Sequence, residues 1–147
     1  MRLPTELKDR KGVVLDTMVF IYLFEDGEPF AAVAEFLVQQ MEVGAFHGIL
    51  TPITAAEILV KPYSRQRVDI AKSYQNALRS ITNLDSIEIS HEIGYRAASL
   101  KAAYGLPLPD MIQLACALES NTPALVTNDK ALKKVNEVRI FLFDEFV

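Results

Sequence analysis

The chain has 147 residues, half of them hydrophobic and 23% charged, with 15 basic against 19 acidic side chains and a formal net charge of −4. This composition excludes a disordered chain and predicts one globular domain, residues 1–147, with a substantial core. The negative net charge argues against broad, non-specific binding of nucleic acid over the whole surface.

The first part of the chain is predicted to form two strands and three helices. The spacing of apolar residues and the positions of glycine and proline place them, in chain order, at residues 11–16 (strand), 17–25 (helix), 30–41 (helix), 48–51 (strand) and 52–61 (helix). Pro52 fits the first turn of the last of these helices, and Pro62 marks its end.

The second part is predicted to continue the alternation of helices and strands. Its elements are expected at residues 64–81 (helix, with Val68, Ala71, Tyr74, Ala77 and Leu78 on its inner face), 86–89 (strand), 90–104 (helix), 110–119 (helix), 123–126 (strand), 130–134 (short helix) and 138–142 (strand). Strands that alternate with helices form parallel sheets with right-handed crossovers. We therefore predict a three-layer α/β/α domain with a central, mainly parallel sheet of about four to five strands.

The sequence has no feature of membrane insertion or secretion. No apolar run reaches the ~18 residues of a membrane span, and the first ten residues lack the apolar stretch of a signal peptide. The single cysteine, Cys116, has no partner for an internal disulfide, which is typical of a reducing compartment. We expect a cytoplasmic protein without a membrane partner, in which Cys116 is a packing residue.

Four acidic residues stand beside apolar runs, at places where a strand is predicted to be followed by a helix or within the next helix. They are Asp16, Glu57, Asp110 and Asp129. Ligands of open α/β folds bind at the carboxyl edge of the sheet, where such residues would gather. Like charges brought together repel, and a hard divalent cation such as Mg²⁺ compensates them through carboxylate oxygens. The pattern therefore favours metal-dependent chemistry on phosphate esters.

Each of these acids also has a simpler structural explanation. Asp16 and Asp129 stand where an aspartate caps a helix, a contribution of about 1 kcal/mol. Asp110 fits the first turn of a helix, where an acidic residue is favourable. Glu57 is flanked by apolar residues and can lie on the wet face of its helix.

Residues 61–79 carry five basic side chains against one acidic side chain. This segment can be an ordinary solvated helix face or a local patch that contacts phosphates. In the second case Lys61, Arg65 and Arg67 are the candidate substrate-binding residues.

Four segments resemble, in the right order, the motifs of PIN-domain nucleases. They are Val13-Val14-Leu15-Asp16-Thr17, then Thr54-Ala55-Ala56-Glu57-Ile58-Leu59, then Leu106-Pro107-Leu108-Pro109-Asp110-Met111-Ile112-Gln113-Leu114-Ala115, and finally Leu125-Val126-Thr127-Asn128-Asp129-Lys130-Ala131-Leu132. The third segment is the most specific match. The resemblance runs over nearly the whole chain, and many stand-alone members of this family are VapC-like toxins of toxin–antitoxin modules.

The resemblance implies a PIN-like fold and an endoribonuclease that uses Mg²⁺ or Mn²⁺. Its catalytic metal ligands would be Asp16, Glu57, Asp110 and Asp129, with Thr17 and Thr127 in supporting positions. It also implies an RNA substrate, a small antitoxin protein as partner, and a homodimer. Met18 departs from the family pattern, which often has a small polar residue at that position.

Three other functions remain open from the sequence. The chain could be a non-catalytic PIN-like module that binds RNA or protein, or an RNA-processing nuclease that is not a toxin. A phosphatase with Asp16 as a covalent nucleophile fits poorly, because the haloacid-dehalogenase-like pattern requires a second aspartate two residues later, where Met18 stands.

Overall fold

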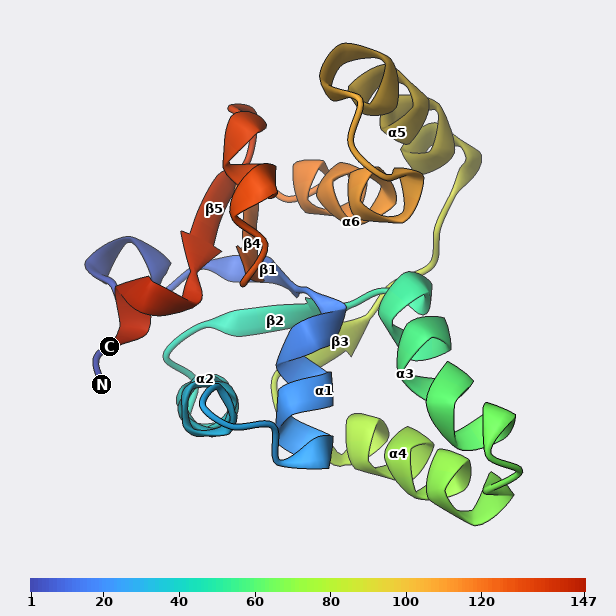
Figure 1. Cartoon of the computed structure of the whole chain (residues 1–147). Helices are drawn as coiled ribbons and strands as arrows, with labels where there is room; N and C mark the ends of the chain where they lie inside the picture. The colour runs from blue at the N-terminus through green and yellow to red at the C-terminus, as the bar shows by residue number, and fades with distance from the viewer.

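A five-stranded, fully parallel sheet forms the centre of the computed structural model, which describes all 147 residues (Figure 1). Its strands are β1 (Lys11–Leu15), β2 (His47–Leu50), β3 (Leu84–Ser86), β4 (Ala124–Thr127) and β5 (Arg139–Leu142). They lie in the order β3-β2-β1-β4-β5, and every neighbouring pair is parallel. The predicted number and direction of the strands are confirmed.

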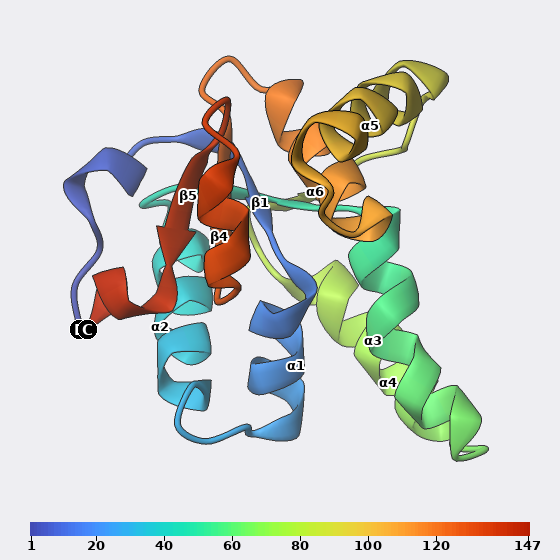
Figure 2. The same ribbon diagram turned by 45° about the horizontal axis from the view of Figure 1, so that its top comes forward.

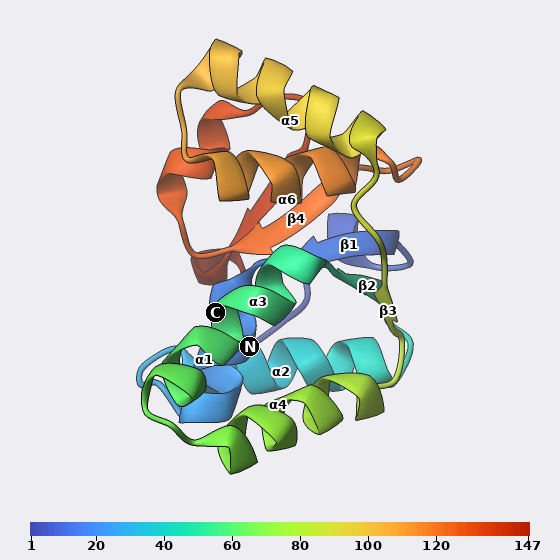
Figure 3. The ribbon, with the colours of Figure 1, turned by 90° about the vertical axis from the view of Figure 1, so that its right-hand side faces the viewer.

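Helices cover both faces of the sheet and make the three predicted layers. They are α1 (Thr17–Glu25), α2 (Ala31–Glu42), α3 (Pro52–Ser64), α4 (Val68–Ser80), α5 (His91–Tyr104) and α6 (Leu108–Leu118), with short 3₁₀ segments at η1 (Thr5–Leu7), η2 (Lys130–Lys134) and η3 (Phe143–Phe146). Helices α1, α2 and α4 lie on one side of the sheet, and α5 and α6 lie on the other (Figure 3). Helix α3 contacts both α1 and α6, and it runs beside α4 (Figure 2).

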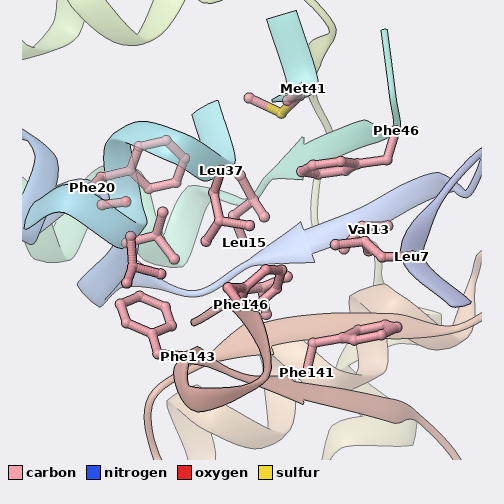
Figure 4. Packing of buried hydrophobic residues seen from close by; sticks show 14 of the residues in the cluster. Leu7, Val13, Leu15, Phe20, Leu37, Met41, Phe46, Phe141, Phe143 and Phe146 are labelled. Carbon is pink, nitrogen blue, oxygen red and sulfur yellow. The ribbon is translucent and has the colours of Figure 1, made fainter. Parts of the chain in front are cut away.

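Alternating side chains of the strands fill two separate cores. On β1, Val13 and Leu15 belong to a cluster of 19 buried residues on the α1–α2 side, whereas Val14 belongs to a cluster of 15 on the α5–α6 side. This two-residue period is the geometry of a strand buried on both faces. Figure 4 shows the first cluster, in which Phe20 and Phe143 pack together with side chains of the sheet.

The structure corrects three predicted boundaries. Helix α3 continues through Pro62 to Ser64, and a turn at Gln66, with a φ of 55°, separates it from α4. The next helix therefore begins at Val68 rather than residue 64, and Val68 is exposed instead of lying on the inner face. Strand β3 covers residues 84–86, not 86–89, because its register with β2 ends at Ser86 and the side chains of Ile87 and Ile89 pack against the α5–α6 core.

The order of the strands places the topological switch point of the sheet between β1 and β4, and we refer to the edge at the carboxyl ends of these two strands as the crevice. The chain proceeds from β1 to β2 and β3 on one side, then crosses through α5 and α6 to build β4 and β5 on the other side (Figure 1). Loops that leave adjacent strands in opposite directions open a crevice at their carboxyl ends, which is the usual ligand site of such folds. No helix in the structure has the length and apolar character needed to cross a bilayer.

Candidate active site

Asp16 lies at the carboxyl end of β1 and caps the first turn of α1. Its side chain is almost buried, with 5% of its surface exposed, and accepts three hydrogen bonds. The donors are the Thr17 amide at 2.9 Å, the Thr127 hydroxyl at 2.8 Å and the Gln113 side-chain amide at 3.4 Å. The capping role expected for Asp16 is therefore present, and donors from β4 and α6 converge on the same carboxylate.

Asp129 lies across the crevice, at the turn that follows β4. Its backbone amide donates to the Thr127 hydroxyl at 3.0 Å, and its side chain caps η2 by accepting from the Ala131 amide at 3.0 Å. Thr127 therefore contacts both Asp16 and the backbone of Asp129. The amide of Asn128 donates to the sulfur of Met18 at 2.9 Å. Met18, which stands where a small polar residue was expected, therefore links the first turn of α1 to this loop.

Glu57 reaches the crevice from α3. Its side chain accepts a 2.6 Å hydrogen bond from the hydroxyl of Thr17, the residue that follows Asp16. The same hydroxyl lies 3.0 Å from that of Thr54, one helical turn before Glu57. Glu57 itself is exposed, whereas Thr54 beneath it is fully buried. Because one end of this side chain is tied to α1 while the rest faces solvent, Glu57 is available to a ligand.

Asp110 enters from the opposite layer, in the first turn of α6. It is half-buried and accepts no hydrogen bond from another side chain. Burial, followed in order of size by the negative charges of Asp16, Asp129 and Glu57, raises the pKa of Asp110 to about 6. The four predicted acids therefore act electrostatically on one another across a single crevice. Burial also raises the pKa of Asp16, an effect that its three hydrogen bonds oppose.

The chemistry of this donor set fits a hard divalent cation. All four side chains offer carboxylate oxygens, and none of them forms an ion pair with a basic side chain. Burial, together with the repulsion between these acids, raises the pKa of Asp16 and of Asp110. No three acidic, histidine or cysteine side chains approach closely enough to form a complete ligand set by themselves. Such an open arrangement suits Mg²⁺, which usually keeps several waters when it binds to carboxylates.

Three further residues of the site are absent from the sequence prediction. Thr51, Thr54 and Gln113 are at most 1% exposed and join the acids in one polar network. Their spacing in the sequence could have identified them. Thr51, Thr54 and Glu57 recur every three residues, and Gln113 follows Asp110 by three. This spacing places the members of each set on one face of a helix. Gln113 also interrupts an otherwise apolar stretch of α6.

The predicted substrate-binding residues lie at the far end of α3. Lys61 forms an ion pair with Glu25, and Arg67 forms a bidentate ion pair with Asp69 at 2.8 and 3.0 Å. Arg65 is exposed and lies with them around a small cavity of about 80 Å³. Arg65 begins the turn after α3, about 12 Å along the helix from Glu57. This patch therefore flanks the crevice and lies outside the acidic cluster.

A cavity of about 450 Å³ lies beside the acids rather than over them. Its wall includes Phe30 and Leu142, and its rim includes Asn128 and Lys130, the two neighbours of Asp129. Because none of the four acids lines this cavity, its volume is no measure of the space available at the carboxylates.

The sequence matches the profile of the PIN domain over residues 13–138. A comparison with proteins of curated function gave no significant match.

Solved structures share the fold over most of this chain. A chain of a toxin–antitoxin complex from Klebsiella pneumoniae is similar with a TM-score of 0.65 and 27% identity, over 86% of this chain and 94% of that one. A chain of VapBC-1 from nontypeable Haemophilus influenzae is similar with a TM-score of 0.66 and 20% identity, over 90% and 98%. A chain of VapBC2 from Rickettsia felis, bound to a promoter DNA fragment, gives a TM-score of 0.66 at 16% identity, over 88% and 96%.

Proposed function

Because the chain belongs to the PIN domain family, we propose that it is a metal-dependent endoribonuclease and the toxin of a toxin–antitoxin pair. The observation that supports this proposal is the electrostatic interaction of four acidic side chains at the crevice between β1 and β4, where burial and the charges of the other three acids raise the pKa of Asp110 to about 6. Excess negative charge of this kind is costly to a purely structural cluster, and it is useful for holding a cation.

Asp16, Glu57, Asp110 and Asp129 are the residues that would hold Mg²⁺ or Mn²⁺, directly or through water. A bound divalent cation supplies a Lewis acid for the scissile phosphate and lowers the pKa of water toward neutrality. The chain itself fixes the orientation of two of these carboxylates. Thr127 and the Thr17 amide orient Asp16, and the Thr17 hydroxyl orients Glu57. No serine or cysteine nucleophile is required, and Cys116 is buried away from solvent with a raised pKa of about 11.

Cleavage of a total RNA pool with and without a chelator tests the activity. We expect fragments in the presence of Mg²⁺ or Mn²⁺ and none after chelation, because the carboxylates alone offer no nucleophile. Binding of RNA without cleavage under either condition would instead identify a non-catalytic PIN-like module. Growth arrest on expression, relieved by co-expression of the adjacent gene, would separate a toxin from an RNA-processing nuclease.

The toxin assignment draws support from the Klebsiella pneumoniae structure, which is described as a toxin–antitoxin complex. We accordingly propose a small antitoxin protein as a partner, together with self-association into a homodimer. The aromatic residues of α1 and α2 contribute little free surface to either contact, because Phe20 is buried and the others pack against the core. Exposed apolar side chains stand instead on α3 and α4, at Val60, Tyr63 and Val68.

The basic patch leads to a prediction about RNA binding. Replacing Arg65 and Arg67 together with glutamate is expected to weaken RNA binding by about tenfold or more and to flatten its salt dependence, since each phosphate contact to a single strand contributes ~0.7 to the slope. Titrations of labelled RNA at several salt concentrations measure both effects. The matched control reverses Arg96 and Lys101, two exposed cations of α5 on the other side of the sheet. If the salt dependence of RNA binding had the same slope in both double variants and in the unmodified protein, the basic patch would be ruled out as an RNA-binding site.

A further inference from the structure

A continuous line of buried polar side chains runs beneath the acids, from the start of α3 through α6 to Glu57. Thr51 bonds to the carbonyl oxygen of the Gln113 side chain, and the Gln113 amide nitrogen lies 2.7 Å from the Thr54 hydroxyl. Thr54 then lies 3.0 Å from the Thr17 hydroxyl, which donates to Glu57. Gln113 is 1% exposed, and no buried polar side-chain atom of the protein lacks a partner.

The hydrogen positions along this line follow from the number of protons available. A hydroxyl has one proton to donate, and the Thr17 hydroxyl donates it to the carboxylate of Glu57. Thr54 must therefore donate to Thr17, which leaves Thr54 as the acceptor from the Gln113 amide. In each of these four hydrogen bonds the donor is therefore on the Thr51 side and the acceptor is on the Glu57 side.

The orientation of the Gln113 amide sets this direction. Its nitrogen lies 3.4 Å from a carboxylate oxygen of Asp16, as well as 2.7 Å from Thr54. A flipped amide would turn its carbonyl oxygen toward the Asp16 carboxylate, and two acceptors would then face each other in a buried site. Thr51 donates to the carbonyl oxygen on the far side and holds the same orientation.

We propose that Gln113 is a positioning residue that couples Asp16 to Glu57. It donates directly to Asp16 and, through Thr54 and Thr17, determines that the proton of Thr17 is directed at Glu57. Two acids from different layers of the fold are thus held as hydrogen-bond acceptors in a fixed mutual orientation, although no direct bond joins them. The catalytic part of this inference rests on the proposed nuclease function, whereas the coupling itself is a property of the metal-free protein.

The test uses two variants. Gln113→Leu removes both N–H donors of the side-chain amide and keeps a side chain of similar size. Thr54→Val removes the hydroxyl and keeps the shape of the side chain, so it interrupts the line. Ser90→Ala is the matched stability control, because Ser90 caps α5 through the Ile93 amide at 3.2 Å and touches no member of the line. The first measurement is the ¹³C chemical shift of the Glu57 carboxyl carbon in the metal-free protein. We expect both network variants to move it and Ser90→Ala to leave it in place.

The second measurements are the Mn²⁺ dissociation constant by calorimetry and the kinetics of RNA cleavage. Residues that orient metal ligands typically change metal affinity or activity by about 10–100-fold. We expect such a rise in the dissociation constant and such a fall in kcat for each single variant, with KM within about twofold. The double variant should be no worse than Gln113→Leu alone, because Thr54 acts on Glu57 only through the line that Gln113→Leu already interrupts.

The outcomes separate this inference from the proposed function. An unchanged Glu57 shift in both variants, or additive effects in the double variant, overturns the coupling even if the unmodified protein cleaves RNA. A shift that moves in both variants, in a protein that neither binds Mn²⁺ nor cleaves RNA, upholds the coupling and overturns the nuclease. If Gln113→Leu does not fold, the same comparisons are made with Thr54→Val alone.

Discussion

Replacing Asp16 with asparagine is expected to lower the rate of RNA cleavage by about 10³-fold or more, which corresponds to ~4 kcal/mol in the activation barrier. Asp16 is the most buried of the four acids and the one that contacts residues of β4, α1 and α6 at once. Removal of its charge takes away the central anionic ligand proposed for the cation, and a neutral amide oxygen is a much weaker ligand for Mg²⁺.

The same substitution is expected to leave the fold intact. Asparagine keeps an oxygen that can accept from the Thr17 amide, and its new NH₂ group can donate to the Thr127 hydroxyl, which has a free acceptor position. Burial disfavours the charged form of Asp16, as its raised pKa shows, so a neutral side chain costs nothing in desolvation. The melting temperature should therefore stay within about 3 °C of the original value.

The control for this prediction is Asp85→Asn, which removes an exposed carboxylate on β3, away from the crevice. It should cleave RNA as fast as the unmodified protein. If Asp16→Asn retained that rate as well, the assignment of the acidic site would be wrong.

Replacing Asp110 with asparagine is expected to have opposite effects on activity and on stability. Cleavage should fall about as far as in Asp16→Asn, since another proposed ligand is lost. The metal-free variant, however, should be more stable than the unmodified protein at neutral pH. Burial and three neighbouring negative charges raise the pKa of Asp110 from its ordinary value of 3.8 to about 6, so the folded protein carries a strained carboxylate above that pH.

The pH dependence identifies the origin of this gain. Between pH 4 and pH 6 the folded state binds more protons at Asp110 than the unfolded state does, and stability therefore falls as the pH rises through this range. Asp110→Asn has no carboxyl group at this position, so its stability does not fall for this reason over the same pH range. Because Asp110 is half-exposed and partly screened by solvent, we expect a gain of about 1–2 kcal/mol above pH 6, or roughly 3–6 °C, and no gain below pH 4.

Thermal melts at pH 4, 5, 6 and 7.5, with and without Mn²⁺, measure these differences. Mn²⁺ should raise the melting temperature of the unmodified protein at pH 7.5 and should raise that of Asp110→Asn much less. A variant whose melting curve stays parallel to that of the unmodified protein from pH 4 to 7.5 would show that Asp110 is not under electrostatic strain.

The sequence was sufficient for the layers of the fold and for the position of the acids along it. Strand and helix periods are local properties, so the bounds of α1 were predicted to the residue and four of the five strands were found where strands were expected. The errors occur where tertiary contacts override local signals. The apolar alternation at residues 86–89 comes from a crossover that packs Ile87 and Ile89 on the second core, and Pro62 lies inside α3 instead of ending it.

The contacts within the site were harder to predict than its members. The carboxylates, Thr17 and Thr127 could be named from short motifs. Several contacts of the site, however, join residues that are 37 to 111 positions apart in the chain, such as Thr54 with Thr17 and Thr127 with Asp16. Gln113 shows the same difficulty, because a glutamine in an apolar helix looks like an exception until the fold places Asp16 and Thr54 at its amide. The ion pairs of Lys61 and Arg67 were likewise invisible in a count of basic residues.

The crossover that separates the two halves of the sheet also determines when the crevice becomes complete. Asp16 and Glu57 belong to the part of the chain made before α5, and Asp110 and Asp129 belong to the part made after it. A growing polypeptide on the ribosome therefore carries at most two of the four carboxylates until residue 110 has been made. It acquires the last one, Asp129, only after β4 has been translated, so any activity of the crevice arises only once β4 has been inserted beside β1.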